Sequence, residues 1–209
     1  MKNSFFIITL LLITTFSSAQ KIKKVSVKDE SGLKETYSVL KSDPSVRHGE
    51  YKKATNYLLV KGQYSHGERS GVWEYYSPKS KLVQQYDFTS DTLLYNYNGL
   101  EYAMDSTQYT RSIVILGGLY PVLKQVGRSI RYPAEAKKNR TEGKVNVKFV
   151  VDAKGNVKQM EVVEGIGDGC DEEVMKAFQG VEFECIPALD LKGSPVESEF
   201  VLPISFKLD

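Results

Sequence analysis

The side chains best suited to catalysis or metal binding are scarce in this chain of 209 residues, which contains two cysteines and two histidines. So few cysteines and histidines exclude a Cys/His zinc cluster and a small scaffold held together by many disulfides. A cysteine nucleophile needs a nearby base, yet His48 and His66 lie far from Cys170 and Cys185 in the sequence. We therefore expect no enzyme, no metal site and no cofactor.

The two cysteines could instead pair with each other. Cys170 stands at the start of a predicted helix, and Cys185 lies at the end of a short predicted return strand. A ten-residue helix rises about 15 Å, and five strand residues return about 16 Å, so the two sulfur atoms could meet. A disulfide is one alternative, and two buried thiols are the other.

The charge balance argues against nucleic acid as a partner. Lys and Arg number 28 against 26 Asp and Glu, a formal net charge of +2, whereas binding to a phosphate backbone needs a concentrated basic surface. The glycines at 165, 167 and 169 precede a predicted helix, but they lack the Lys-Ser/Thr ending of a phosphate-binding loop and have acidic neighbours. We interpret them as a turn, without a nucleotide or other small-molecule cofactor.

The first 19 residues have the pattern of a secretory signal peptide. Lys2 precedes a largely apolar run at 5–16, and small residues follow up to Ala19. Because a membrane-spanning helix needs about 20 apolar residues, we expect cleavage between Ala19 and Gln20 and export to an oxidising compartment. An uncleaved inner-membrane anchor is the alternative. The lysines after the cut, at 21, 23, 24 and 28, are interpreted as a solvated tail.

Tyrosine marks a boundary between two kinds of sequence. All 13 tyrosines precede Pro133, whereas the residues after it are rich in valine. Short aromatic and β-branched segments separated by Gly, Pro, Asn and Ser fill residues 20–110, which is typical of strands and hairpins. We predict a small all-β domain at 20–110 and a second domain at 111–209.

A loose repeat within the first domain places an aromatic residue two positions after a glycine, at Gly49-Glu50-Tyr51, Gly62-Gln63-Tyr64 and Gly71-Val72-Trp73. Residues two apart share one face of a strand, so a ring can lie over a neighbouring backbone that has no side chain. Residues 46–88 resemble the MORN-type repeat, whose hairpins stack into a meandering sheet. A purely structural hairpin stack is one interpretation. An aromatic surface for a partner or glycan, made by Tyr51, Tyr64, Trp73 and Tyr75, is the other.

The second domain alternates helices and strands. Apolar residues at three- and four-residue steps predict a helix from Leu119 to Ile130, and a short helix follows Pro133. Alternating apolar residues predict a hairpin with strands at 144–152 and 157–163. Acidic residues at 171–173 favour a helix start there, and the last strand has its apolar residues at even positions from 196 to 208.

Several segments of this second domain, in the same order, resemble the TonB C-terminal domain over about residues 118–209. The segments that carry the resemblance are Tyr132-Pro133-x-x-Ala136, Glu142-Gly143-x-Val145-x-Val147-x-Phe149-Val150-Val151, Gly155-x-Val157, Asp171-Glu172 and Leu202-Pro203-Ile204-x-Phe206. The resemblance implies an α+β fold in which two helices cover one face of a three-stranded antiparallel sheet.

The resemblance also implies a function in the cell envelope. Such a domain captures an extended peptide of an outer-membrane receptor in the periplasm by adding it as a strand to the sheet edge. Mapped onto this chain, the docking edge consists of Glu199, Phe200, Val201, Leu202, Ile204, Ser205 and Phe206, and Pro203 removes one donor from it.

The chain differs in two features from an energy transducer of TonB-dependent transport. It shows no Pro-rich spacer, and its apolar N-terminal run is short. We therefore predict an exported periplasmic or outer-membrane-associated module that binds a protein by strand addition. The first alternative is an energy transducer with an uncleaved N-terminal anchor. The second is a structural envelope scaffold, or a homodimer formed by edge pairing.

Overall fold

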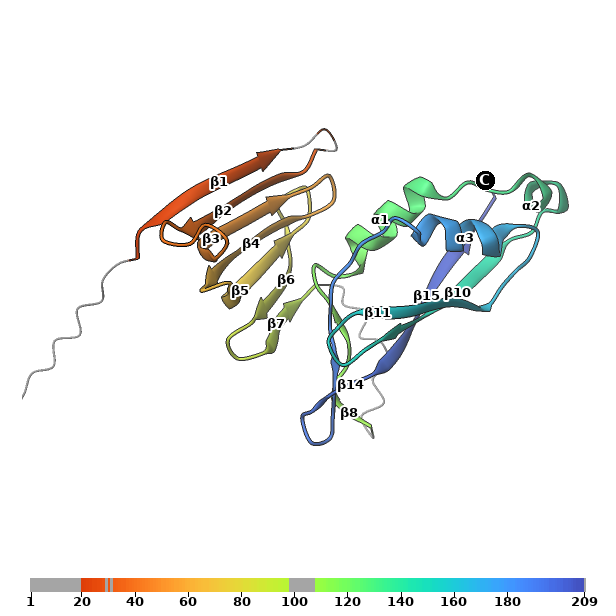
Figure 1. Ribbon diagram of the computed structural model, residues 1–209. Helices are drawn as coiled ribbons and strands as arrows, with labels where there is room; N and C mark the ends of the chain where they lie inside the picture. The colour runs from red at the N-terminus through yellow and green to blue at the C-terminus, as the bar shows by residue number, and fades with distance from the viewer. Residues whose placement is uncertain (1–19, 29, 31, 98–107, 209) are drawn as a thin grey trace, which may run out of the picture.

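The computed structural model describes residues 20–28, 30, 32–97 and 108–208. The predicted signal peptide, with Ala19, lies outside these residues. Two parts follow each other along the chain, an all-β part and a mixed part with three helices (Figure 1).

The first part is a seven-stranded antiparallel meander in which every strand pairs with the next one along the chain. Its strands are β1 (Ile22–Lys28), β2 (Lys34–Leu40), β3 (Arg47–Ala54), β4 (Leu59–Ser65), β5 (Glu68–Tyr76), β6 (Leu82–Asp87) and β7 (Thr92–Asn96). The tightest turn joins β4 to β5 through His66 and Gly67, which both have positive φ, at 50° and 93°. Two such residues in succession fit a hairpin turn whose twist matches that of its strands.

The aromatic residues of this sheet are packed inside it. Trp73 is 1% exposed and Tyr51 8%, and their ring centroids lie 5.0 Å apart. The indole ring lies over Gly62, where an added Cβ would come within 2.3 Å of it, as the glycine-aromatic pattern predicts. The aromatic-surface interpretation is therefore wrong for Tyr51, Trp73 and Tyr75, which are buried in the core of the sheet, while Tyr64 is half-buried against them.

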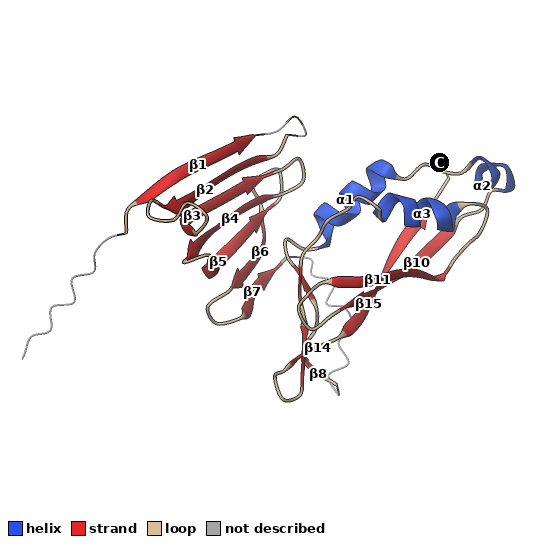
Figure 2. Ribbon diagram, in the orientation of Figure 1, coloured by secondary structure: helices blue, strands red, loops and turns tan. Residues whose placement is uncertain are grey.

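The second part is built on a three-stranded antiparallel sheet with the strand order β11-β10-β15. Its elements are α1 (Leu119–Ser129), α2 (Ala134–Asn139), β10 (Gly143–Val151), β11 (Val157–Glu164), α3 (Cys170–Phe178) and β15 (Ser198–Phe206). Helices α1 and α3 lie on one face of this sheet (Figure 2). The short helix predicted after Pro133 is α2, which ends at Arg140 in a left-handed conformation. It is a third helix, where the resemblance implies two.

The core of the second part follows from alternation along its strands. Residues 145, 147, 149 and 151 of β10 are buried, as are the even residues 198–206 of β15. The rings of Phe149 and Phe200, which are paired across the two strands, stack with centroids 4.9 Å apart. Phe178 of α3 packs edge-on against Phe149 at 5.1 Å, so the helix and the two strands share one apolar layer.

Short strands join the two parts: β8 (Tyr109–Arg111), β9 (Val114–Ile115), β12 (Cys185–Ile186), β13 (Ala188–Asp190) and β14 (Pro195–Val196). Alternate side chains of residues 113–116 enter different cores. Ile113 and Ile115 pack in the core of the second part, whereas Val114 and Leu116 pack in the core of the seven-stranded sheet. This segment therefore belongs to both parts.

Both cysteines are free, buried thiols in the structure, which corrects the disulfide alternative. The geometric argument assumed that the chain returns along α3 as a strand. Residues 179–184 form no strand, and Cys185 instead pairs with Ile115 of β9. The chain leaves the end of α3 and runs away toward β14 (Figure 1).

Candidate functional site

Strand β15 lies at one edge of the β11-β10-β15 sheet and pairs on one side only, with β10, among the residues that the structure describes. Its buried side chains alternate with exposed ones at Glu199, Val201, Pro203 and Ser205. The even residues of the predicted docking edge therefore anchor the strand, and the odd residues face outward. An unpaired strand edge of this kind presents backbone donors and acceptors to an incoming strand.

Pro203 indicates which backbone groups face the open side. Its pairing with Asn146 is part of an unbroken register between β10 and β15. Because proline has no N–H to give to that ladder, a proline in a strand directs its nitrogen away from the partner strand. The backbone N–H and C=O groups of successive residues in a strand point to opposite sides. The N–H groups of Glu199, Val201 and Ser205 therefore point to the same open side as the nitrogen of Pro203.

The exposed face beside this edge carries an ionic ladder across all three strands. Lys148 on the central strand lies 2.6 Å from Glu161 on β11 and 3.7 Å from Glu199 on β15. The hydrogen bond to Glu161 raises the pKa of Lys148, and the same bond lowers the pKa of Glu161. Both groups are thus charged at neutral pH, and Glu199 places a carboxylate next to any added strand.

The last residues of β15 are tied to the start of β10. The ring of Tyr132 packs edge-on against Phe206 with centroids 5.4 Å apart, and its hydroxyl donates a hydrogen bond to the carbonyl of Thr141. The backbone N–H of Leu208 donates to Glu142 at 2.6 Å. These contacts fasten the end of the terminal strand to the Tyr132-Pro133 and Glu142-Gly143 segments.

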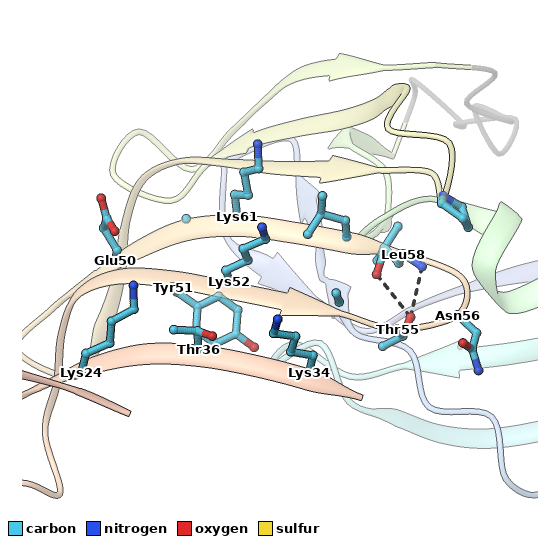
Figure 3. Close-up of a pocket in the computed structure, with 14 residues that line it drawn as sticks. Lys24, Lys34, Thr36, Glu50, Tyr51, Lys52, Thr55, Asn56, Leu58 and Lys61 are labelled. Carbon is cyan, nitrogen blue, oxygen red and sulfur yellow. Dashed lines mark hydrogen bonds between the residues drawn. The ribbon is translucent and has the colours of Figure 1, made fainter. Parts of the chain in front are cut away.

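A second candidate surface, which sequence reasoning missed, lies on the outer face of the seven-stranded sheet. A groove of about 870 Å³ there is lined by Lys24, Lys34, Lys52 and Lys61, together with Glu50. Figure 3 shows these lysines standing on the same side of their strands. The expectation of a solvated tail is wrong for Lys23, Lys24 and Lys28, which belong to β1. The signal in the sequence was at least one lysine in each of four successive strand segments.

Comparison with protein families supports the assignment of the second part. Residues 128–208 match the family model described as Gram-negative bacterial TonB protein C-terminal. This is a non-enzymatic family of protein-interaction domains of the Gram-negative envelope. Comparisons with curated proteins and with solved structures gave no match. None of the helices in the described residues has the length and apolar character needed to span a bilayer.

Proposed function

We propose that this protein is an exported binding module of the cell envelope, which captures an extended segment of an outer-membrane receptor, or of another envelope protein, along β15. The observation that carries the proposal is the open edge of β15, whose exposed residues alternate with buried anchors. The family match over residues 128–208 gives the class of partner. In this proposal the signal peptide is cleaved after Ala19, and the MORN-like sheet is an accessory domain of the same exported protein.

Strand addition would use the donors of Glu199, Val201 and Ser205 and the acceptors between them. Pro203 interrupts this row once, so a bound peptide is held by two groups of backbone hydrogen bonds on either side of it. Affinity comes from these main-chain bonds, whereas the exposed side chains of Glu199 and Val201 select the residues of the peptide. The carboxylate of Glu199 favours a basic residue opposite it.

The decisive experiment replaces Val201 by proline in the full mature chain. Because one hydrogen bond contributes about 0.5–1.5 kcal/mol, we expect affinity for a bound peptide to fall by about twofold to tenfold. The probes are synthetic peptides that cover the periplasm-facing segments of outer-membrane receptors, and binding is measured by calorimetry. Circular dichroism checks that the variant is folded, since Val201 points its N–H away from β10.

Two further variants separate the backbone from the side chain. Val201→Thr keeps the N–H and the branched shape, so it should bind nearly as the parent does. Pro203→Val supplies the missing donor and should strengthen binding. Equal affinity of the parent, Val201→Pro and Pro203→Val in folded proteins would exclude strand addition at β15. Sedimentation at several concentrations tests whether the edge instead pairs with a second copy.

A further inference from the structure

Five lysines share the face of the seven-stranded sheet that lies opposite its aromatic core. They come from four adjacent strands: Lys24 and Lys28 from β1, Lys34 from β2, Lys52 from β3 and Lys61 from β4. All five are exposed. The face is therefore strongly basic, although the chain as a whole has a net charge of only +2.

The strand register arranges these lysines in three rows across the sheet. Lys28 pairs directly with Lys34, and Lys52 pairs directly with Lys61. Because Ser26 pairs with Thr36 and Thr36 with Lys52, the row of Lys52 and Lys61 lies midway between Lys24 and Lys28. Successive rows are two residues apart, which corresponds to about 6.7 Å along the strands.

Two carboxylates stand on the same face, because Glu74 of β5 pairs directly with Lys61 and Glu50 lies two residues before Lys52 on β3; the five lysines outnumber them. Like charges placed directly opposite each other on neighbouring strands destabilise a sheet. This face contains two such pairs, Lys28 with Lys34 and Lys52 with Lys61. Among the described residues none of the five lysines forms an ion pair within 4 Å with Asp or Glu. Of the nearby carboxylates, Glu74 accepts hydrogen bonds from Tyr76 at 2.7 Å and Gln85 at 3.2 Å. Glu50 stands at one end of the groove.

We propose that this lysine face binds an acidic, extended polypeptide segment whose Asp or Glu residues occupy alternate positions. Side chains two apart on an extended chain point the same way and repeat at about 6.7 Å, which is the spacing of the three lysine rows. The segment lies along the strand direction, from the row of Lys24 to the row of Lys28 and Lys34. Each acidic side chain then meets one row.

The floor of the groove fits a peptide better than a phosphate-rich surface. The short side chain of Thr36 lies between the lysines. Ala54, Leu58 and Leu59 also line the groove and give it apolar surface. Apolar groups can pack there beside the charged ones, as peptide side chains do. Bare phosphate groups would leave this apolar surface uncovered.

The experiment compares two short synthetic peptides of the same composition on the full mature chain. In one, glutamate alternates with serine, and in the other the glutamates form a single block. We expect the alternating peptide to bind more tightly, with an affinity that falls as salt is raised. Equal affinity for the two peptides, or no binding of either, would overturn the proposal.

A double variant and a matched control locate the site. Lys52→Gln/Lys61→Gln should weaken the alternating peptide about fivefold or more, because exposed charge pairs contribute modestly and two are lost. Lys41→Gln/Lys79→Gln removes the same charge from exposed lysines outside the groove and should leave affinity within about twofold.

Two further measurements complete the test. The melting temperature of Lys52→Gln/Lys61→Gln checks the fold. Relief of the repulsion between the two lysines offsets the loss of the contact between Lys61 and the Tyr76 ring, 4.7 Å away, so a loss of binding at an unchanged melting temperature reports the site. Anionic phospholipid vesicles are the competing probe. Binding to vesicles that depends on Lys52 and Lys61, without preference for the alternating peptide, would assign the face to a membrane and refute the peptide proposal.

Discussion

At the scale of the residue, the contact between Trp73 and Gly62 controls the packing of the seven-stranded sheet. An added Cβ at Gly62 would come within 2.3 Å of the indole ring. Because an extra methyl group in a packed core forces neighbouring groups to shift, we expect Gly62→Ala to lower the free energy of unfolding by about 1–3 kcal/mol. Urea unfolding followed by Trp73 fluorescence measures this change.

Gly127 provides the matched control for that substitution. It lies in α1, its φ is not positive, and an added Cβ would meet nothing within 4 Å. Glycine is about 1 kcal/mol less favourable than alanine inside a helix, so Gly127→Ala should increase stability. If the two substitutions changed stability in the same direction, the packing explanation for Gly62 would be wrong.

The burial of Cys185 predicts a pH-dependent loss of stability. Burial raises the pKa of the Cys185 thiol to about 12, and it also raises the pKa of Cys170. A thiol in the unfolded chain ionises near pH 8.5. The stability that comes from keeping Cys185 protonated is therefore present below that pH and is lost as pH rises toward 12.

Alkylation with iodoacetamide, followed by mass spectrometry, tests the state of these thiols. In the native protein at pH 8, both cysteines should react slowly, whereas in urea without reductant both should react fully. A native labelling rate equal to that of the unfolded chain would contradict the raised pKa values. A parallel series of urea titrations from pH 7 to pH 10 should show falling stability.

For the aromatic residues of the seven-stranded sheet, the sequence pattern predicted which groups touch, but it did not predict which side chains are exposed. The glycine-aromatic spacing correctly predicted a ring over a bare backbone, realised by Trp73 and Gly62. The same spacing does not reveal which face of the sheet is covered. Tyr51 and Trp73 are buried because Val114 and Leu116 pack in the same core, and these residues belong to a segment that follows the sheet in sequence.

At the scale of the element, the end of α2 offers a site where stability can be gained. Arg140 has φ 55° and ψ 37° at the C-cap, a left-handed conformation that glycine adopts without a steric penalty. The left-handed conformation costs a residue with a Cβ about 1–2 kcal/mol, and the greater chain entropy of glycine offsets part of that, so we expect Arg140→Gly to raise the free energy of unfolding by about 0.5–1 kcal/mol. Lys138→Gly, inside the same helix, should lower it by about 1 kcal/mol. Thermal unfolding by circular dichroism compares the two, and a loss of stability in Arg140→Gly would contradict this account.

Elements with strong periodicity were predictable, and short ones were not. The alternation in β10 and β15 predicted both strands and their buried faces, and the hairpin of β10 and β11 was confirmed. Strands β8, β9, β12, β13 and β14 have two or three residues each, which is too few for a period to show. They form because the two parts of the molecule bring their partners together.

At the scale of the whole molecule, a segment of alternating apolar residues and a few polar bonds couple the two parts. Arg69 of β5 forms an ion pair with Glu184 at 2.7 Å, and Gln84 of β6, 1% exposed, bonds to the backbone that leads into α1. No sequence pattern predicts these contacts, because the sequence does not distinguish a buried glutamine in a strand from an exposed polar residue. The position of the lysine face was hidden for a similar reason, since strand pairing alone brings its residues together.

Gln84 is the residue on which we expect this coupling to depend most. Its amide donates a hydrogen bond to the carbonyl of Ile115 at 3.0 Å and accepts one from the N–H of Gly117 at 2.7 Å. In Gln84→Ala both backbone groups lose their partner in a buried place, at a cost of about 1–3 kcal/mol each. The single tryptophan reports the seven-stranded sheet, whereas the helical circular dichroism signal reports the second part.

In the parent protein these two signals should change together during urea unfolding, as one cooperative transition requires. In Gln84→Ala the Trp73 fluorescence transition should separate from the helical transition, because the sheet can unfold without the second part. Gln85→Ala is the control. The side chain of Gln85, next to Gln84 in the sequence, bonds to Glu74 on the outer face of the sheet, so the two transitions of this variant should stay coincident. Coincident transitions in Gln84→Ala would mean that the apolar residues 113–116, rather than the buried amide, hold the two parts together as one unit.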